Sequence, residues 1–426
     1  MMSDDTATIG LITVQSKSYS ERLLLLTLAS INFTTVVDFL IVLPLGPQYM
    51  RVFNLTPAQF GLIVSSYALS AGIAGVAASF FLDRLDRRPA LLALYLGFGL
   101  GTLFCAMAPT YPLLVTARIV AGAFGGVSGA LILAIIGDVI PAARRGAAMG
   151  MVMSAFSVAS IVGVPLGLLL ASHLNWHVPF YGLAGLSVVV WLLTLRAMPA
   201  LQGHLHHATD EHPIKRTLAV LRHKDHQRAF VFMAVLTVSG FVVFPYLSNY
   251  MVANVGLTEK QLPLIYLFGG LCTIFSMNWI GRWADRSGKR LVFIIMSLCA
   301  TIPIFALTNL PRVPLALAIS TSTLLMICMS GRMVPAMALM TGSIEARYRG
   351  GFMSINSSVQ QFSCGLAAYA SGRIIGQSAT GELTRFPWVG LISVSCILSC
   401  IFLSRFLKAP AVPVASEAAM VVEHEC

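Results

Sequence analysis

The chain repeats one charged pattern: "FFLDRLDRRPALL" (80–92) and "RWADRSGKRLVF" (282–293) place an Asp-Arg pair and a following basic pair 202 residues apart. Each copy is a short charged segment between two long apolar runs. Four ordered matches with nearly constant offset indicate an internal repeat, and therefore two halves of related fold that run in the same direction. The other three matches have offsets of 201 to 204 and are "LTPAQ" (55–59) with "LTEKQ" (257–261), Pro44, Tyr49 and Met50 with Pro245, Tyr250 and Met251, and "RGAAM" (145–149) with "RGGFM" (349–353).

The composition is that of an integral membrane protein. Of 426 residues, 57% are hydrophobic and only 11% are charged, whereas a soluble protein carries roughly 25% charged residues. The apolar runs reach about 20 residues or more, enough to cross ~30 Å of hydrocarbon as helices. They are continuous rather than alternating, which argues against a transmembrane β-barrel.

The runs predict an all-α polytopic membrane protein with twelve transmembrane helices in two six-helix bundles related by pseudo-symmetry. Parallel repeats of this kind around a midplane site are a transporter architecture. We place the spans at about 22–46, 58–82, 89–109, 112–139, 146–172, 178–198, 228–253, 258–283, 290–309, 313–341, 350–375 and 386–406. The predicted domains are an N-terminal tail (1–21), a first bundle (22–198), a central loop (199–227), a second bundle (228–406) and a C-terminal tail (407–426).

The basic residues predict the orientation. If the N-terminus lies inside, 21 of the 28 Lys and Arg fall in inside segments and five fall in outside loops. This distribution satisfies the positive-inside rule, so we expect both termini in the cytoplasm and the protein in the cytoplasmic (inner) membrane. It also accounts for the net charge of +11 without a nucleic-acid partner.

No pattern in the sequence indicates a cofactor or a metal. Seven of the eight cysteines lie in apolar runs, where cysteine behaves as a small hydrophobe. The histidines of the central loop match no zinc-ligand spacing, so we favour a solvated linker over a metal site. No G-x-x-x-x-G-K-[ST] loop is present, so ATP is not the expected energy source. The histidines in question are His204, His206, His207 and His212.

The motifs of residues 22–406 together resemble those of the major facilitator superfamily. "GRWADRSGKR" (281–290) fits the family's loop pattern G-x-x-x-D-R-x-G-R-R, whereas the first copy has Ser79 and Asp86 where glycines are expected. The resemblance implies the drug–proton antiporter branch, especially arabinose-efflux-permease-like exporters. Three further stretches are similar to family motifs of spans one, four and five, namely "VVDFLIVLP" (36–44), "LVTARIVAG" (114–122) and "GVPLG" (163–167).

Asp38 is the only acid in the apolar stretch "TTVVDFLIVLP" (34–44). A charge at the centre of a span costs ~2.5–3.5 kcal/mol, so we expect it to have a partner. At 1.5 Å per residue, Asp38 lies ~6 Å and Arg118 ~11 Å to the outer side of their span centres, within reach of a long side chain. Tyr67 falls at similar depth and could donate a hydrogen bond. We interpret these three residues as a proton-coupling site; the alternative is a structural Arg118 bonded to backbone carbonyls.

The repeated charged loops are candidates for gating. Positive-inside topology needs no acid, so the acids suggest ion pairs that form when the inner exit is closed and break when it opens. The resemblance pairs Asp138, at the inner end of span four, with the arginines of the first loop. We also expect Asp83 to face the N-terminus of span eleven. The alternative is a purely topogenic role. The gating candidates are Asp83, Arg84, Arg87, Arg88, Asp138, Asp285, Arg286, Lys289 and Arg290.

The second half offers neutral polar side chains and one cation for substrate binding. Arg332 has no carboxylate in any span of that half, Gln360 and Gln361 lie near the middle of span eleven, and Asn249 lies toward the outer end of span seven. Such a set suits a polyhydroxylated, neutral or weakly anionic group. The equally weighted alternative is that the amides merely bond between helices, at ~0.6 kcal/mol each.

Glycine and proline residues predict local backbone features in spans four and five. Gly163, Pro165 and Gly167 should kink span five, because proline removes a backbone donor. The glycines of span four form small-x-x-x-small pairs, which favour close helix packing. These glycines are Gly122, Gly125, Gly126 and Gly129.

Together these features predict a transporter rather than an enzyme: a monomer in membrane lipid that exports small organic molecules, such as sugars or drugs, by proton-coupled antiport and alternating access. It would need no cofactor beyond the proton gradient. An importer or facilitator of a metabolite on the same fold is the main alternative. A non-transporting membrane sensor is remote, because the tails are too short for a signalling module. At offset 201 the counterpart of Asp38 is Ser239, so we place proton coupling in the first half.

Overall fold

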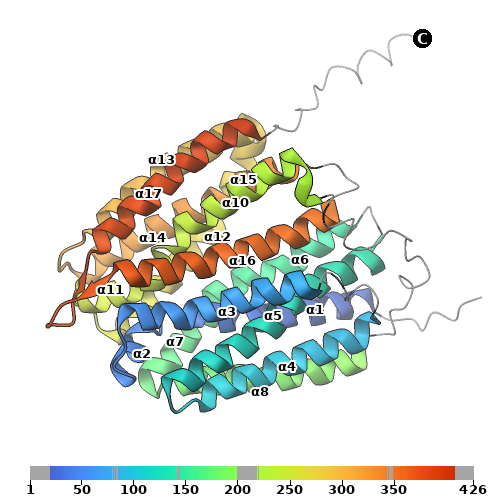
Figure 1. Ribbon diagram of the computed structural model, residues 1–426, viewed down its shortest axis with the longest axis horizontal. Helices are drawn as coiled ribbons and strands as arrows, with labels where there is room; N and C mark the ends of the chain where they lie inside the picture. The colour runs from blue at the N-terminus through green and yellow to red at the C-terminus, as the bar shows by residue number, and fades with distance from the viewer. Residues whose placement is uncertain are drawn as a thin grey trace, which may run out of the picture.

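The computed structural model describes residues 20–78, 80, 82, 85–141, 144–198, 218, 220–342, 344 and 349–407. The long helices run side by side in two groups (Figure 1). The first bundle contains α1 (Glu21–Ile41), α2 (Gly46–Val52), α3 (Pro57–Ala78), α4 (Arg87–Met107), α5 (Tyr111–Val139), α6 (Arg145–Val158), η2 (Ala159–Gly163), α7 (Val164–His173) and α8 (His177–Ala197).

The second bundle has the same plan. It contains α10 (Lys224–Phe241), η4 (Phe244–Tyr246), α11 (Leu247–Ala253), η5 (Glu259–Gln261), α12 (Leu262–Ser287), α13 (Lys289–Thr308), α14 (Leu315–Gly331), α15 (Met333–Gly342), α16 (Arg349–Ile374), the strands β1 (Gly376–Gln377) and β2 (Leu383–Thr384), α17 (Phe386–Leu403) and η7 (Ser404–Phe406). The seven-residue helices α2 and α11 are offset by 201 residues, which is the offset of the sequence repeat.

Among the described residues, eleven helical segments are long and apolar enough to cross a membrane. The remaining crossing is α16, which has 26 residues and a polar middle, "INSSVQQFS" (355–363). This helix packs against α3 of the first bundle and α10 of the second, so much of its surface meets protein rather than lipid (Figure 1). The predicted fold with twelve transmembrane helices is confirmed, and its least apolar helix lies at the junction between the bundles.

Several helix limits differ from the predicted spans. The first span was expected to continue to residue 46, but α1 ends at Ile41 and α2 begins at Gly46. Pro44 lies in the break, and its missing N–H cannot continue the helical hydrogen bonds. In the second bundle Pro245 accompanies the same break. α10 begins at Lys224, within the segment expected to be a loop. The exact domain limits, and the tails outside the described residues, stay predictions.

We call the end of the molecule where α1 ends and α3 begins the distal end, and the opposite end, where α1 begins, the proximal end. α2, α11 and the β1–β2 hairpin lie at the distal end (left in Figure 1). One buried apolar cluster lies within residues 24–198 and another within 220–407, while a third combines residues of both bundles. Each bundle therefore has its own core, and a shared apolar core joins them.

Candidate functional site

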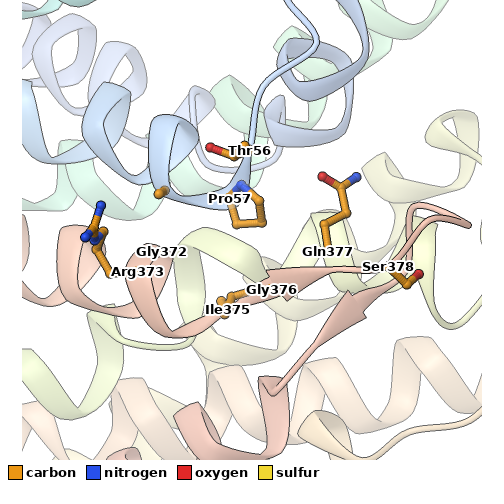
Figure 2. Close-up of a pocket in the computed structure, with 9 residues that line it drawn as sticks. Thr56, Pro57, Gly372, Arg373, Ile375, Gly376, Gln377 and Ser378 are labelled. Atoms are coloured by element: carbon orange, nitrogen blue, oxygen red, sulfur yellow. The ribbon is translucent and has the colours of Figure 1, made fainter.

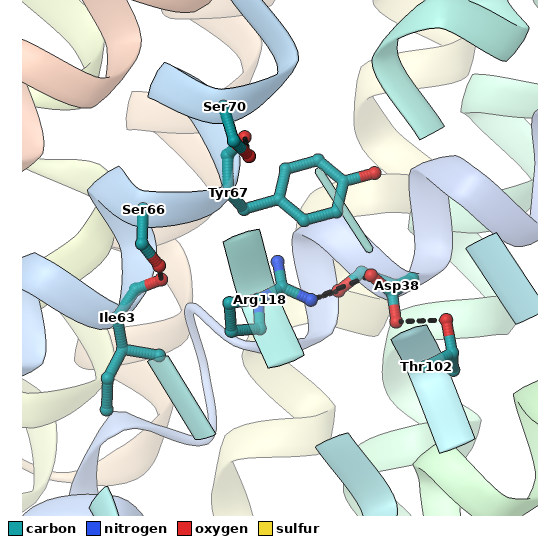
Figure 3. A network of polar contacts seen from close by, with 7 residues as sticks. All are labelled: Asp38, Ile63, Ser66, Tyr67, Ser70, Thr102 and Arg118. Atoms are coloured by element: carbon teal, nitrogen blue, oxygen red, sulfur yellow. Dashed lines mark hydrogen bonds and ion pairs between the residues drawn. The ribbon is translucent and has the colours of Figure 1, made fainter. Parts of the chain in front are cut away.

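Asp38 and Arg118 form an ion pair inside the first bundle. The Arg118 Nη1 atom lies 2.7 Å from Oδ2 of Asp38, and both side chains are fully buried. The same nitrogen donates to the backbone carbonyl of Asp38 at 3.2 Å. Thr102 of α4 donates its hydroxyl to Oδ1 of Asp38 at 3.1 Å (Figure 3). The expected contact between Asp38 and Arg118 is therefore present, with a third helix holding the carboxylate.

The position of Asp38 in its helix makes a cationic partner important. Asp38 lies in the last turn of α1, where the helix dipole disfavours a negative charge. Burying a carboxylate also costs several kcal/mol unless an opposite charge and hydrogen bonds compensate. Arg118 supplies the charge from the second turn of α5. A change in the charge of Asp38 would therefore alter the packing of α1 against α4 and α5.

Tyr67 contacts the pair through its ring. The guanidinium carbon of Arg118 lies 4.3 Å from the centroid of the Tyr67 ring, which is a cation–π distance. Figure 3 shows the ring beside the guanidinium and the hydroxyl directed away from it. Among the described residues, no hydrogen bond joins the Tyr67 hydroxyl to Asp38 or Arg118. The hydrogen bond that Tyr67 could donate to the pair is absent among the described residues, because the ring face rather than the hydroxyl meets the charge.

Glycines of α5 allow α3 to approach the pair. A Cβ atom at Gly122 would collide with the backbone carbonyl of Tyr67, and one at Gly125 would lie 2.6 Å from the Tyr67 hydroxyl. A Cβ atom at Gly126 would lie 2.6 Å from that of Ala71, whereas one at Gly129 would meet nothing within 4 Å. Close packing thus explains three of the four glycines and leaves Gly129 without a packing role.

The sequence reasoning missed several residues around the pair. Thr102 and Cys105 lie three positions apart on α4, and Thr102 is the second side chain that donates to the Asp38 carboxylate. The Tyr49 hydroxyl is buried and has no hydrogen-bond partner among the described residues. The same is true of Nε and Nη2 of Arg118. A lone Thr or Tyr in an apolar run gives no signal of such a role without the fold.

Some of the gating candidates of the first loop form ion pairs or hydrogen bonds in the structure. Nε of Arg87 lies 2.9 Å from Oδ2 of Asp138, so the expected pairing of Asp138 with the first loop is present. Arg88 donates to the Leu195 carbonyl at 2.7 Å. Asp86, which stands where the family pattern has glycine, caps α4 by accepting from the backbone N–H of Arg88 at 3.0 Å. Asp83 and Arg84 lie outside the described residues.

The second charged loop forms a different set of contacts. Asp285 and Arg286 are exposed and Lys289 is half-buried, and within the described part of the chain none of them makes an ion pair. Arg290 donates to the Leu407 carbonyl at 2.6 Å. The repeated sequence pattern therefore does not produce a repeated salt bridge among the described residues.

The four expected substrate residues lie in different surroundings. Asn249 is buried at the distal end, where its amide would meet a Cβ atom at Gly46 of the first bundle. Arg332 is 1% exposed and donates through Nη2 to the Ser239 hydroxyl at 2.5 Å. Gln361 lines a small cavity between α3, α5 and α16, and Gln360 is half-buried. No hydrogen bond joins any two of these four side chains in the described structure.

Arg332 contacts the second-half counterpart of Asp38, which is a neutral residue. Its contact, Ser239, is the residue that the sequence repeat aligns with Asp38. The Ser393 hydroxyl of α17 donates to the Ser239 backbone carbonyl, so this arrangement lies between α10 and α17. Nε and Nη1 of Arg332 have no partner among the described residues. Both halves thus bring a buried arginine to the same repeat position of their first long helix, but only the first half supplies an acid there.

The predicted irregularity in the fifth span is a π-helical turn. η2 (Ala159–Gly163) separates α6 from α7, and Pro165 is the second residue of α7. Cβ atoms at Gly163 and Gly167 would collide with Val37 and approach Ile41, both in α1. The two glycines therefore bring η2 and α7 against the helix that carries Asp38. Across the described residues, no cluster of His, Cys, Asp and Glu could hold a metal ion.

Sequence comparisons identify relatives among transporters. The family model of the Major Facilitator Superfamily matches residues 28–368 and 229–421. An uncharacterized MFS-type transporter, YceJ of Bacillus subtilis, is 24% identical over 83% of this chain and 87% of its own length. A probable sugar efflux transporter of Helicobacter acinonychis is 23% identical over 70% and 76%, respectively. A chloramphenicol resistance protein of Streptomyces lividans is 25% identical over 57% and 62%.

Solved structures share the fold. A D-xylose-proton symporter superimposes with a TM-score of 0.75 at 17% identity, covering 93% of this chain and 99% of that protein. A point mutant of the nucleoside transporter NupG gives 0.69 at 14% identity, covering 90% and 100%. Transporters of this class are not enzymes and typically need no cofactor. The family model, the relatives and the twelve-helix fold lead to one conclusion: the chain is a membrane transporter that belongs to the Major Facilitator Superfamily.

Proposed function

We propose that the protein exports small organic molecules, such as sugars or drugs, in exchange for protons. The observation that carries this proposal is the fully buried pair of Asp38 and Arg118. An intramembrane acid and base that face each other are costly and are typical of ion and proton pathways. The efflux direction is supported by relatives named as a sugar efflux transporter and a chloramphenicol resistance protein.

The chemistry requires two states of Asp38. Ionised, the carboxylate accepts from Arg118 and Thr102 and holds α1, α4 and α5 together. Protonated, it loses its attraction for the guanidinium, which remains charged and becomes available to another acceptor. Because Tyr67 of α3 covers the guanidinium, movement of Arg118 would be felt by the helix that packs against α16 of the second bundle. Proton binding would in this way bias the junction between the bundles.

The remaining assignments follow the same scheme. The Arg87–Asp138 pair would act as part of a proximal gate, together with the other charged residues of the two loops. Of the four substrate candidates we place Gln361 first, because it lines the small cavity where α16 of the second bundle meets α3 and α5 of the first. Asn249, Gln360 and Arg332 would contribute only if a conformational change exposed them. We place the protein as a monomer in lipid of the inner membrane, with both termini, and therefore the proximal end, in the cytoplasm.

Transport by purified protein in liposomes tests this function. Radiolabelled xylose and chloramphenicol serve as first probes, and a thermal-shift screen of sugars, antibiotics and amino acids widens the set. In vesicles in which the distal end faces the lumen, a lumen more acidic than the outside should drive uptake of the probe. Asp38→Asn should abolish this gradient-driven uptake while the protein remains folded. Flux in the direction of the proton gradient would instead support an importer. Wild-type gradient-driven flux in Asp38→Asn would end the proposal.

A further inference from the structure

The two bundles share a hydroxyl-mediated contact at the distal end. Tyr246 belongs to η4 of the second bundle and is fully buried. Its hydroxyl lies 3.0 Å from the carbonyl oxygen of Pro57, the first residue of α3 in the first bundle. The same hydroxyl lies 3.1 Å from the carbonyl oxygen of Ala368 in α16. One phenolic proton is therefore shared between carbonyls of two helices that belong to different bundles.

Two glycines make room for this hydroxyl. Gly61 and Gly372 each follow one of the two carbonyls by four residues, on the same helix face. A Cβ atom at either glycine would collide with the Tyr246 hydroxyl. The Cβ atom at Gly61 would also lie 2.8 Å from the Ala368 carbonyl, and that at Gly372 would lie 2.8 Å from the Pro57 carbonyl. α3 and α16 thus form a close-fitting site for the Tyr246 hydroxyl, and this site is complete only while the two helices are in contact.

The repeat does not reproduce this contact in the first bundle. At the repeat offset of 201, the counterpart of Tyr246 in the first bundle is Leu45, which is buried and has no hydroxyl. A second polar link between the bundles, the ion pair of Arg51 with Glu259, has a largely exposed arginine side chain. Exposed ion pairs contribute little because water and salt screen them. The buried Tyr246 hydroxyl is therefore the better candidate for holding the distal end closed.

Beside the tyrosine, the bundles leave a groove with a volume of about 480 Å³. Its walls are Thr56–Ala58 of the first bundle and residues 372–378 of the second, excluding Ile374 (Figure 2). The groove is open to the outside of the molecule and leads to Pro57 and Gly372, which frame the hydroxyl. Opening of the junction would bring water from this groove onto both carbonyls, which would then be solvated without the tyrosine.

We propose that Tyr246 is a positioning residue that latches α3 to α16 and stabilises the state in which the distal end is closed. The inference rests on the proposed alternating-access function, but its test needs neither substrate nor a proton gradient. Loss of one hydrogen bond should change the ratio of closed to open protein by about 2- to 10-fold.

Hydrogen–deuterium exchange on the full-length protein in nanodiscs tests the latch. In Tyr246→Phe, exchange should become about 2- to 10-fold faster in distal peptides covering 53–62 and 368–378. Exchange should slow in proximal peptides covering 145–152 and 276–287, because opening one end closes the other. The matched control is Tyr250→Phe, whose hydroxyl donates to the Leu310 carbonyl at 3.0 Å within the second bundle.

The control should leave both distal and proximal exchange at wild-type rates. Gly372→Ala, which places a methyl group in the space that the hydroxyl occupies, should reproduce the effect of Tyr246→Phe. Unchanged distal exchange in Tyr246→Phe would overturn the latch. So would an equal change in Tyr250→Phe, or faster distal exchange without slower proximal exchange, since the latter indicates local loosening only. A failure of Asp38→Asn to alter transport would count against proton coupling and leave the latch result intact.

Discussion

Removal of the Asp38 charge has a stability consequence that the geometry allows us to estimate. Breaking a buried ion pair by removing one partner costs ~3–5 kcal/mol, because the other charge stays buried. In Asp38→Asn, Arg118 keeps the bond to the backbone carbonyl of residue 38 and the cation–π contact with Tyr67. The latter contact contributes ~0.5–2 kcal/mol. We therefore expect a loss near the lower limit, about 3 kcal/mol.

A double-mutant cycle separates the ion pair from other effects of substitution. Arg118→Gln should cost about as much as Asp38→Asn, since it leaves a carboxylate with Thr102 as its remaining side-chain partner. The double variant carries two neutral amides that can bond to each other, so it should be more stable than either single variant. Free energies of unfolding would come from SDS titration in mixed micelles, followed by tryptophan fluorescence. Losses that simply add in the double variant would refute the coupling inferred from the 2.7 Å contact.

Three further predictions concern the surroundings of the Asp38–Arg118 pair and the proximal Arg87–Asp138 pair. Tyr67→Phe should retain the aromatic face and wild-type stability, whereas Tyr67→Leu should lose ~0.5–2 kcal/mol in the same unfolding assay. Gly122→Ala should destabilise the protein by ~1–3 kcal/mol through overpacking; Gly129→Ala, whose new methyl group meets nothing within 4 Å, should be neutral or slightly stabilising. Asp138→Asn breaks the ion pair with Arg87 and should increase the rate at which a thiol reagent labels a cysteine introduced at the proximal end. Equal labelling rates in the wild-type background and the variant would show that this pair is not part of the gate.

The fold was predictable because its signals are long and repeated. Apolar runs give the number of helices directly, and the offset of 201 to 204 residues is enough to relate the two bundles to each other. The short helices α2 and α11 reproduce that offset, but their separation from the preceding helices depends on local proline chemistry. Helix limits near Pro44 and Pro245 were therefore displaced, although the number and order of crossings were correct.

The site was predictable where charge dictates a partner. Asp38 and Arg118 must compensate each other if both are buried, and a depth estimate was enough to pair them. Tyr67 was placed correctly in depth but with the wrong contact, because sequence does not tell which part of a ring meets a cation. Neutral residues such as Thr102 have no such constraint. Arg332 shows the same limit, since its partner Ser239 could be aligned by the repeat but not recognised as a contact.

The measurement that tests proton coupling most directly is proton release on ligand binding in weakly buffered detergent solution. A pH indicator reports the protons, and calorimetry reports binding of whichever probe from the thermal-shift screen binds the wild-type protein. Binding to the ionisable site should release protons from the wild-type protein and none from Asp38→Asn, which should still bind the same probe. Equal proton release by Asp38→Asn and wild type at equal occupancy would contradict the assignment of Asp38 as the proton site.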